Sequence, residues 1–100
     1  MIFEIAQLRA KAGHADHMRE GLTRARAVIS RSPGYLGSTF VQGIEDPLRV
    51  TLLIQWDSIE SHMKGFREGP LFAEWRSHWA EHMDGTPDVQ HYTPFAGPQP

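Results

Sequence analysis

Alternating apolar positions open the chain and predict a strand over residues 2–9. Both faces of this strand are partly apolar, with Phe3 and Ile5 on one and Ile2, Ala6 and Leu8 on the other. Two further runs, residues 35–44 and 48–56, are rich in β-branched, aromatic and leucine side chains. The short polar turn Glu45-Asp46-Pro47 separates these two runs, which predicts an antiparallel hairpin.

Two helical regions follow from apolar residues spaced three or four apart. The first covers residues 15–29, with the stripe Ala15, Met18, Leu22, Ala25 and Ile29. It ends at Ser32-Pro33-Gly34, because the residue before a proline disfavours helical backbone. The second region begins at the capping residues Asp57 and Ser58 and is interrupted at Gly69-Pro70. Its inward-facing residues are Ile59, His62, Met63 and Phe66, then Leu71, Phe72, Trp75, Trp79 and Met83.

The order of these elements predicts the fold class. Gly85-Thr86-Pro87 ends the second helical region, residues 88–93 predict a last short strand, and we expect residues 96–100 to form a flexible tail. Strand, helix, strand, strand, helix pair, strand is the split βαβ pattern of an α+β ferredoxin-like fold with a four-stranded antiparallel sheet. A chain of 100 residues has room for one core, so we expect a single domain over residues 1–95.

The sheet should have one face that its own helices leave uncovered. The third predicted strand has Val50, Leu52, Ile54 and Trp56 on one face and Thr51, Leu53 and Gln55 on the other. The first strand is apolar on both faces as well, so a monomer would expose apolar surface to water. We therefore expect two sheets to pack face to face in a homodimer.

Composition and charge exclude several classes of function. The formal net charge of -2 provides no basic surface for nucleic acid. Without cysteine, the chain has no disulfide, thiol nucleophile or cysteine-ligated metal. It also lacks a G-x-G-x-x-G motif and a P-loop, so we expect no bound flavin, nicotinamide or other cofactor. No apolar run is long enough to cross a membrane and none follows a basic leader, so we expect a cytoplasmic protein without membrane contact.

Four short motifs together resemble one known family. They are Ser32-Pro33-Gly34-Tyr35-Leu36-Gly37, the strand end Gln55-Trp56, Ser58-x-Glu60-Ser61-His62 and Gly69-Pro70-Leu71-Phe72. In these motifs the chain resembles the antibiotic biosynthesis monooxygenase domain, and the likeness runs from the first strand to His91-Tyr92. The resemblance implies a dimeric α+β barrel with a pocket between the sheet and the helices of each subunit. Family members include quinone-forming oxygenases, quinol oxygenases and haem-degrading oxygenases.

His62 is the candidate catalytic residue, because it lies on the apolar stripe of its helix between Ile59 and Phe66. Imidazole titrates near neutral pH, so His62 is suited to act as a general base or hydrogen-bond donor towards a phenolic substrate. The alternative is a core histidine whose ring nitrogen donates to a backbone carbonyl.

Large aromatic side chains are the candidate substrate contacts, since they would suit stacking on a flat polycyclic molecule. They are Trp56, Phe66, Phe72, Trp75 and Trp79. Aromatic residues at helical spacing are also typical of an ordinary core. Arg76, next to Trp75, is a candidate partner for a substrate enolate or carboxylate, or else a surface residue.

One stretch matches a zinc-protease pattern. His78-Trp79-Ala80-Glu81-His82 fits H-x-x-E-H, in which two histidines one helical turn apart bind zinc and the glutamate acts as the base. Such a site needs a third protein ligand and a substantial second lobe, which a chain of this size does not readily provide. We expect no metal site here beyond adventitious binding of nickel or zinc.

The sequence departs at three places from the pattern of the family that it resembles. Antibiotic-pathway oxygenases have an asparagine on the third strand, four residues before the tryptophan, where this chain has Leu52. Haem-degrading relatives have an asparagine near the end of the first strand and an iron-ligating histidine on the last helix. The corresponding regions here hold Gln7 and Trp75-Arg76, which disfavours haem degradation.

The resemblance and the candidate residues together favour a cofactor-independent monooxygenase. Such an enzyme binds a quinol or anthrone-like phenol, removes its proton and lets the anion reduce O2 in a dry, oriented site. The alternative is a non-catalytic dimer on the same fold that binds a small ligand or serves a stress response, since one fold supports many functions.

Overall fold

Four strands form one antiparallel sheet in the order β2-β3-β1-β4. A computed structural model of the chain describes residues 1–99 and defines the strands as β1 (Ile2–Arg9), β2 (Tyr35–Gln42), β3 (Arg49–Trp56) and β4 (Asp88–Tyr92). The strand β1, apolar on both faces, lies between β3 and β4. The predicted α+β ferredoxin-like fold is confirmed.

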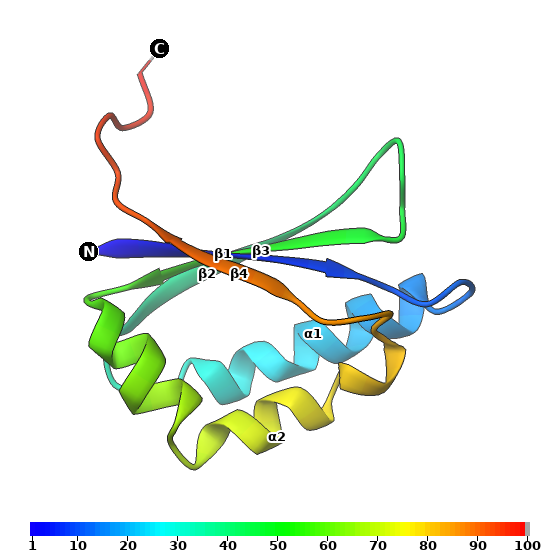
Figure 1. The fold of residues 1–100 in the computed structure, drawn as a ribbon, viewed down its shortest axis with the longest axis horizontal. Coiled ribbons are helices and arrows are strands. Elements are labelled where there is room, and N and C mark those ends of the chain that lie inside the picture. Colours follow the sequence, from blue (N-terminus) through cyan, green and yellow to red (C-terminus); the bar gives the residue numbers. More distant parts are fainter. Residues whose placement is uncertain (100) are drawn as a thin grey trace.

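The helices all cover the same face of this sheet (Figure 1). They are α1 (Ala15–Ile29), the π-helix η1 (Ser61–Arg67), α2 (Leu71–Ser77) and the short 3-10 helix η2 (Ala80–His82). A Cβ at Gly21 of α1 would collide with the backbone carbonyl of His78, so this glycine allows α1 to approach the segment after α2 closely. None of the helices within residues 1–99 has the length and apolar content needed to cross a membrane.

The segment after β3 differs from the predicted helix. Residues 61–67 form a π-helix, whose wider turn places residues four or five apart on one face. His62 and Phe66 are therefore buried, whereas Ile59 is 46% exposed. The prediction that Ile59 faces inward is wrong, because it assumed α-helical spacing. Ser58 caps the segment as expected, since its Oγ accepts the Ser61 N–H at 3.2 Å.

The remaining elements are shorter than predicted. The last helix ends at Ser77 rather than near Gly85, because the backbone leaves the helical region at Trp79, where φ is -141°. In the hairpin, Gln42 ends β2 and Arg49 begins β3. The Asp46 side chain accepts from Arg9 at 2.7 Å and from the Leu48 N–H at 3.2 Å, which shapes the longer turn.

The segment that follows β4 is irregular as far as the structure describes it, which is to residue 99. Residues 93–99 form neither helix nor strand, and residue 100 of the predicted tail lies outside the described residues. Figure 1 shows this segment leaving the sheet on the side opposite the helices.

The sheet face away from the helices is uncovered in a single chain. Its apolar residues pair across strands, with Ile5 opposite Leu53 and Phe3 opposite Tyr92. Phe3, Ile5 and Leu53 remain partly exposed, and Tyr92 is 48% exposed. The two-sided apolar pattern expected from the sequence is therefore present, and one of its two sides lacks a partner.

Candidate functional site

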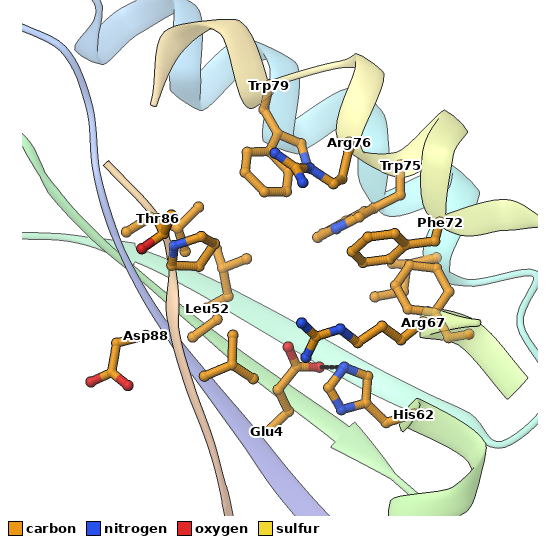
Figure 2. A pocket seen from close by; sticks show the side chains of 16 residues that line it. Glu4, Leu52, His62, Arg67, Phe72, Trp75, Arg76, Trp79, Thr86 and Asp88 are labelled. Atoms are coloured by element: carbon orange, nitrogen blue, oxygen red, sulfur yellow. Dashed lines mark ion pairs between the residues drawn. The ribbon is translucent and has the colours of Figure 1, made fainter. Parts of the chain in front are cut away.

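A cavity of about 490 Å³ lies between the helices and the core face of the sheet (Figure 2). This volume falls within the usual range for small-molecule sites, about 300 to 1,000 Å³. Its inner part is formed by buried side chains, including Glu4, Leu52 and His62, whereas Arg67 and Arg76 lie exposed at its rim. The cavity therefore combines an enclosed interior with a charged entrance.

Aromatic rings form one wall of this cavity. Phe66, Phe72, Trp75 and Trp79 all line it. They pack edge to face, with ring centroids 5.6 Å apart for Phe66 and Phe72, and 5.8 Å apart for Trp75 and Trp79. Edge-to-face packing fixes the rings and leaves a rigid apolar surface for an occupant.

Trp56 has a different place from the other predicted aromatic residues. Its side chain is fully buried behind the cavity and does not line it. The indole Nε1 donates to Glu4 Oε1 at 3.0 Å, and the ring stacks on His62 with centroids 5.3 Å apart. Trp56 thus holds two polar residues of the site in position.

Glu4 is the polar centre of the cavity floor. It lies on the core face of β1 and is only 6% exposed. Besides the Trp56 indole, its Oε1 lies 3.2 Å from His62 Nε2 (Figure 2). Directly opposite Glu4 on the neighbouring strand is His91.

His62 connects Glu4 with His91. Its Nδ1 lies 2.8 Å from His91 Nε2, so one of the two nitrogens donates and the other accepts. The side chain is 3% exposed, yet it still lines the cavity together with Glu4. The structure therefore assigns His62 two side-chain partners in place of the backbone carbonyl of the core-histidine alternative.

Burial controls the protonation of this pair. It raises the pKa of Glu4 to about 7, although the Trp56 hydrogen bond and the positive charge of Arg67 act in the opposite direction. Burial, with smaller contributions from the positive charges of His91 and Arg67, lowers the pKa of His62 to about 4. Between about pH 4 and 7 the contact is therefore a hydrogen bond between a neutral acid and a neutral imidazole.

We predict that this arrangement leaves the free energy of unfolding nearly flat between about pH 4.5 and 6.5. In the unfolded chain over this range, Glu4 is ionised and His62 is protonated. In the folded chain the proton lies on Glu4, so both states bind the same number of protons. The Glu4 contribution falls as the pH rises from about 4.5 to 7, while the His62 contribution grows from about 4 to 6.5.

Single variants should uncover the two opposing slopes, measured by urea unfolding across this range. With Glu4→Gln only His62 titrates, and stability should rise with pH, relative to wild type, by about 3 kcal/mol. With His62→Gln only Glu4 titrates, and stability should fall with pH by a similar amount. If both variants followed the wild-type dependence of stability on pH, folding would not transfer a proton from His62 to Glu4.

The H-x-x-E-H stretch does not form the helical histidine pair that a zinc-protease site requires. The helix ends before Trp79, so His78 and His82 do not share one helix face. The Nδ1 atom of His82 instead lies 3.1 Å from that of His14, at the start of α1. Among residues 1–99, no group of three or more His, Asp or Glu side chains is placed to hold a metal ion.

The structure adds three residues to the predicted site: Glu4, Arg67 and His91. For Glu4 the sequence contained a signal, because strand alternation places it on the same face as Ala6 and Leu8, and a carboxylate in an apolar row is unusual. His91 had no comparable signal, because its role depends on the pairing of β4 with β1.

One buried donor at the cavity has no partner. Trp79 lines the cavity, and its indole N–H makes no hydrogen bond to any of the described residues. A buried polar group left in this way costs about 1 to 3 kcal/mol. An occupant with an acceptor oxygen would recover part of that energy.

The family model for antibiotic biosynthesis monooxygenase matches residues 1–78. The chain belongs to this family. The matched region runs from β1 through α2 and includes Glu4, His62, Arg67 and Arg76, while Trp79 and His91 lie beyond it. Leu52, where the antibiotic-pathway oxygenases have an asparagine, places an apolar side chain on the cavity floor.

Solved structures of similar proteins share the fold of this chain over almost its whole length. A Bordetella bronchiseptica protein assigned to the same family is 32% identical, with a TM-score of 0.92 over 95% of this chain and 97% of that one. The monooxygenase ActVA-Orf6 of Streptomyces coelicolor, in complex with nanaomycin D, has a TM-score of 0.83 at 21% identity over 99% and 91%. The cofactor-independent oxygenase SnoaB of Streptomyces nogalater has a TM-score of 0.82 at 12% identity over 96% and 94%. At 21% and 12% identity, the two Streptomyces proteins show similarity of the fold alone.

Proposed function

We propose that this chain is a cofactor-independent monooxygenase that oxidises an electron-rich phenol, of the quinol or anthrone class, with O2. The observation that carries the proposal is a buried carboxylate with a pKa of about 7 on the floor of an aromatic-walled cavity. A base whose pKa lies near the working pH is well matched to removing a phenolic proton. The fold shared with SnoaB and ActVA-Orf6 supports the same activity.

The proposed reaction begins when Glu4 accepts the substrate proton. The resulting anion reduces O2, one oxygen atom enters the substrate, and the other leaves as water. An anthrone CH2 group is thereby oxidised to a carbonyl, which balances the four electrons that O2 accepts. The dry aromatic cavity strengthens the electrostatic interactions of the anion and keeps the reacting atoms oriented.

His62 is proposed as a hydrogen-bonding residue beside Glu4. Its lowered pKa makes it a weak proton acceptor near neutral pH, whereas Glu4 is matched to that range. The sequence analysis named a general base or a hydrogen-bond donor towards the substrate at this position. Both ring nitrogens of His62 face protein side chains, so we propose that His62 orients Glu4 instead. Phe66, Phe72, Trp75 and Trp79 are the proposed stacking surface, with Arg76 as partner for a substrate enolate or carboxylate.

A ligand-binding dimer without catalysis is the second candidate. Leu52 favours it, because the polar group of the antibiotic-pathway oxygenases is replaced by an apolar side chain on the cavity floor. The homodimer and the cytoplasmic location stay predictions under either function.

Oxygen uptake distinguishes the two candidates. With naphthoquinols or anthrones, and with a chelator but no added flavin, metal or nicotinamide, we expect uptake above the uncatalysed rate. The check is an oxygen electrode, paired with anaerobic calorimetry of the same compounds. Binding of these compounds without any oxygen uptake would reject the oxygenase and favour the ligand-binding dimer.

A further inference from the structure

The two contacts that hold Glu4 use the same one of its carboxyl oxygens. The Trp56 indole N–H donates to Oε1 at 3.0 Å, and His62 Nε2 lies 3.2 Å from Oε1. Neither contact involves Oε2. Figure 2 shows this second oxygen pointing away from His62 and into the cavity that Glu4 lines. One oxygen of the carboxyl is therefore anchored by the protein, while the other faces an occupant.

We propose that Glu4 is a general acid as well as a general base: through Oε2 it takes a proton from the substrate and returns that proton to the oxygen atoms derived from O2, without exchange with water. The inference rests on the proposed function, because it concerns the carbon atom that the proposed oxygenase oxidises. It adds a second catalytic step to Glu4 and assigns both steps to one atom.

The first half of this shuttle takes up one proton and gives it back. Oε2 removes a proton from an anthrone CH2 group, and the electron pair of the broken C–H bond stays on the substrate as an anion. The anion gives one electron to O2, and the two radicals join through a new C–O bond, which leaves a peroxide anion. A peroxide anion is a stronger base than a carboxylate, so Oε2 returns the proton to it and a hydroperoxide forms.

The second half repeats the transfer at the same carbon. Oε2 removes the remaining proton, the electron pair of that C–H bond forms the C=O bond, and the O–O bond breaks. The departing hydroxide takes the proton from Oε2 and leaves as water. The two C–H bonds thus supply the four electrons that O2 accepts. Glu4 ends as the carboxylate with which it began, and no net proton enters or leaves the protein.

The other ionisable groups at the cavity are not suited to this exchange. Arg67 and Arg76 stay protonated and cannot accept a proton. Asp88 is exposed, so its carboxyl exchanges protons with water. Both ring nitrogens of His62 face protein side chains. Among residues 1–99, Glu4 is therefore the cavity group that can both accept and return a proton out of contact with water.

Burial is the reason that the proton should stay with Glu4. This residue is only 6% exposed, and a polycyclic molecule stacked on Phe72 and Trp75 would exclude water from the space between Glu4 and the rim. Loss of the proton through Oε1 is opposed, because burial lowers the pKa of His62 to about 4. The raised pKa of Glu4, about 7, makes its carboxylate a better base than usual and leaves its acid form able to protonate a peroxide anion.

Deuterium retention tests the shuttle without O2. An anthrone with deuterium at both CH2 positions is incubated anaerobically with the protein in ordinary water, and the bound enolate is followed by its visible absorption. We expect the enolate in wild type and in Glu60→Gln, an exposed carboxyl before η1, but not in Glu4→Gln. After subtraction of the uncatalysed loss, wild type should release deuterium at less than about one-tenth of its turnover rate with O2, because the closed site prevents proton leakage.

Proton release during turnover supplies the second measurement. In weak buffer with a pH indicator, stopped-flow mixing with O2 should show no transient release of protons in the first turnover. Deuterium loss as fast as turnover, a transient release of protons, or enolate formation in Glu4→Gln would each overturn the shuttle while oxygen uptake by wild type leaves the oxygenase standing. An absence of oxygen uptake with anthrones would instead reject the proposed function, and the shuttle with it.

Discussion

Replacing Glu4 by Gln is expected to lower the turnover number about 10²- to 10⁴-fold, the usual contribution of a general base. The amide retains an oxygen that accepts the Trp56 indole N–H, so the side chain should keep its place. It cannot accept a proton at neutral pH, and the phenolate would no longer form at the enzyme. Because geometry and cavity walls persist, KM should change little.

Stability separates this loss of catalysis from a loss of folding. Above pH 7 the wild type holds an ionised carboxyl in a buried site, which Gln replaces with a neutral group. The Glu4→Gln protein should therefore be at least as stable as wild type at pH 8, measured by urea unfolding. Glu60→Gln, an exposed carboxyl before η1, is the matched control and should retain full activity. Full activity in Glu4→Gln would exclude Glu4 as the base.

Periodicity along the sequence was sufficient for the fold. Alternation over residues 2–9 and a stripe over residues 15–29 place β1 and α1 at their observed bounds, since burial of one face dominates both elements. The same reasoning wrongly placed Ile59 on the inward face of its helix. Residues 61–67 form the π-helix η1, which buries His62 and Phe66, and the α-helical spacing assumed from the sequence does not distinguish this geometry.

The aromatic part of the site was also accessible to sequence reasoning, because large rings on inward-facing helix positions must share one interior. Phe72, Trp75 and Trp79 accordingly line one cavity. The acid–base part required three-dimensional information. Glu4 and His91 are 87 positions apart and become neighbours only through the β1–β4 register. Their contacts, and the pKa of Glu4, follow from that pairing and from burial.

The second prediction with a large effect concerns the sheet face that the helices leave uncovered. Leu53 lies near the middle of this face, opposite Ile5 on β1 and Thr39 on β2. In a face-to-face homodimer both copies of Leu53 would be buried. A charged residue at this position would therefore place two charges in the interface, one from each subunit. Removal of an unpaired charge from water costs about 3 to 5 kcal/mol per site.

We therefore expect wild-type protein to sediment as a dimer at micromolar concentration and Leu53→Asp to sediment as a single chain. The cost of the buried charges corresponds to a rise in the dimer Kd of at least about 10³-fold. The melting temperature should fall as well, because dimerisation stabilises the folded chain by mass action. Ile59→Asp, an exposed apolar residue on the helix-covered side, is the matched control and should remain dimeric. A wild type that sediments as one chain at every concentration would contradict the dimer, and an unchanged dimer in Leu53→Asp would move the interface to another surface.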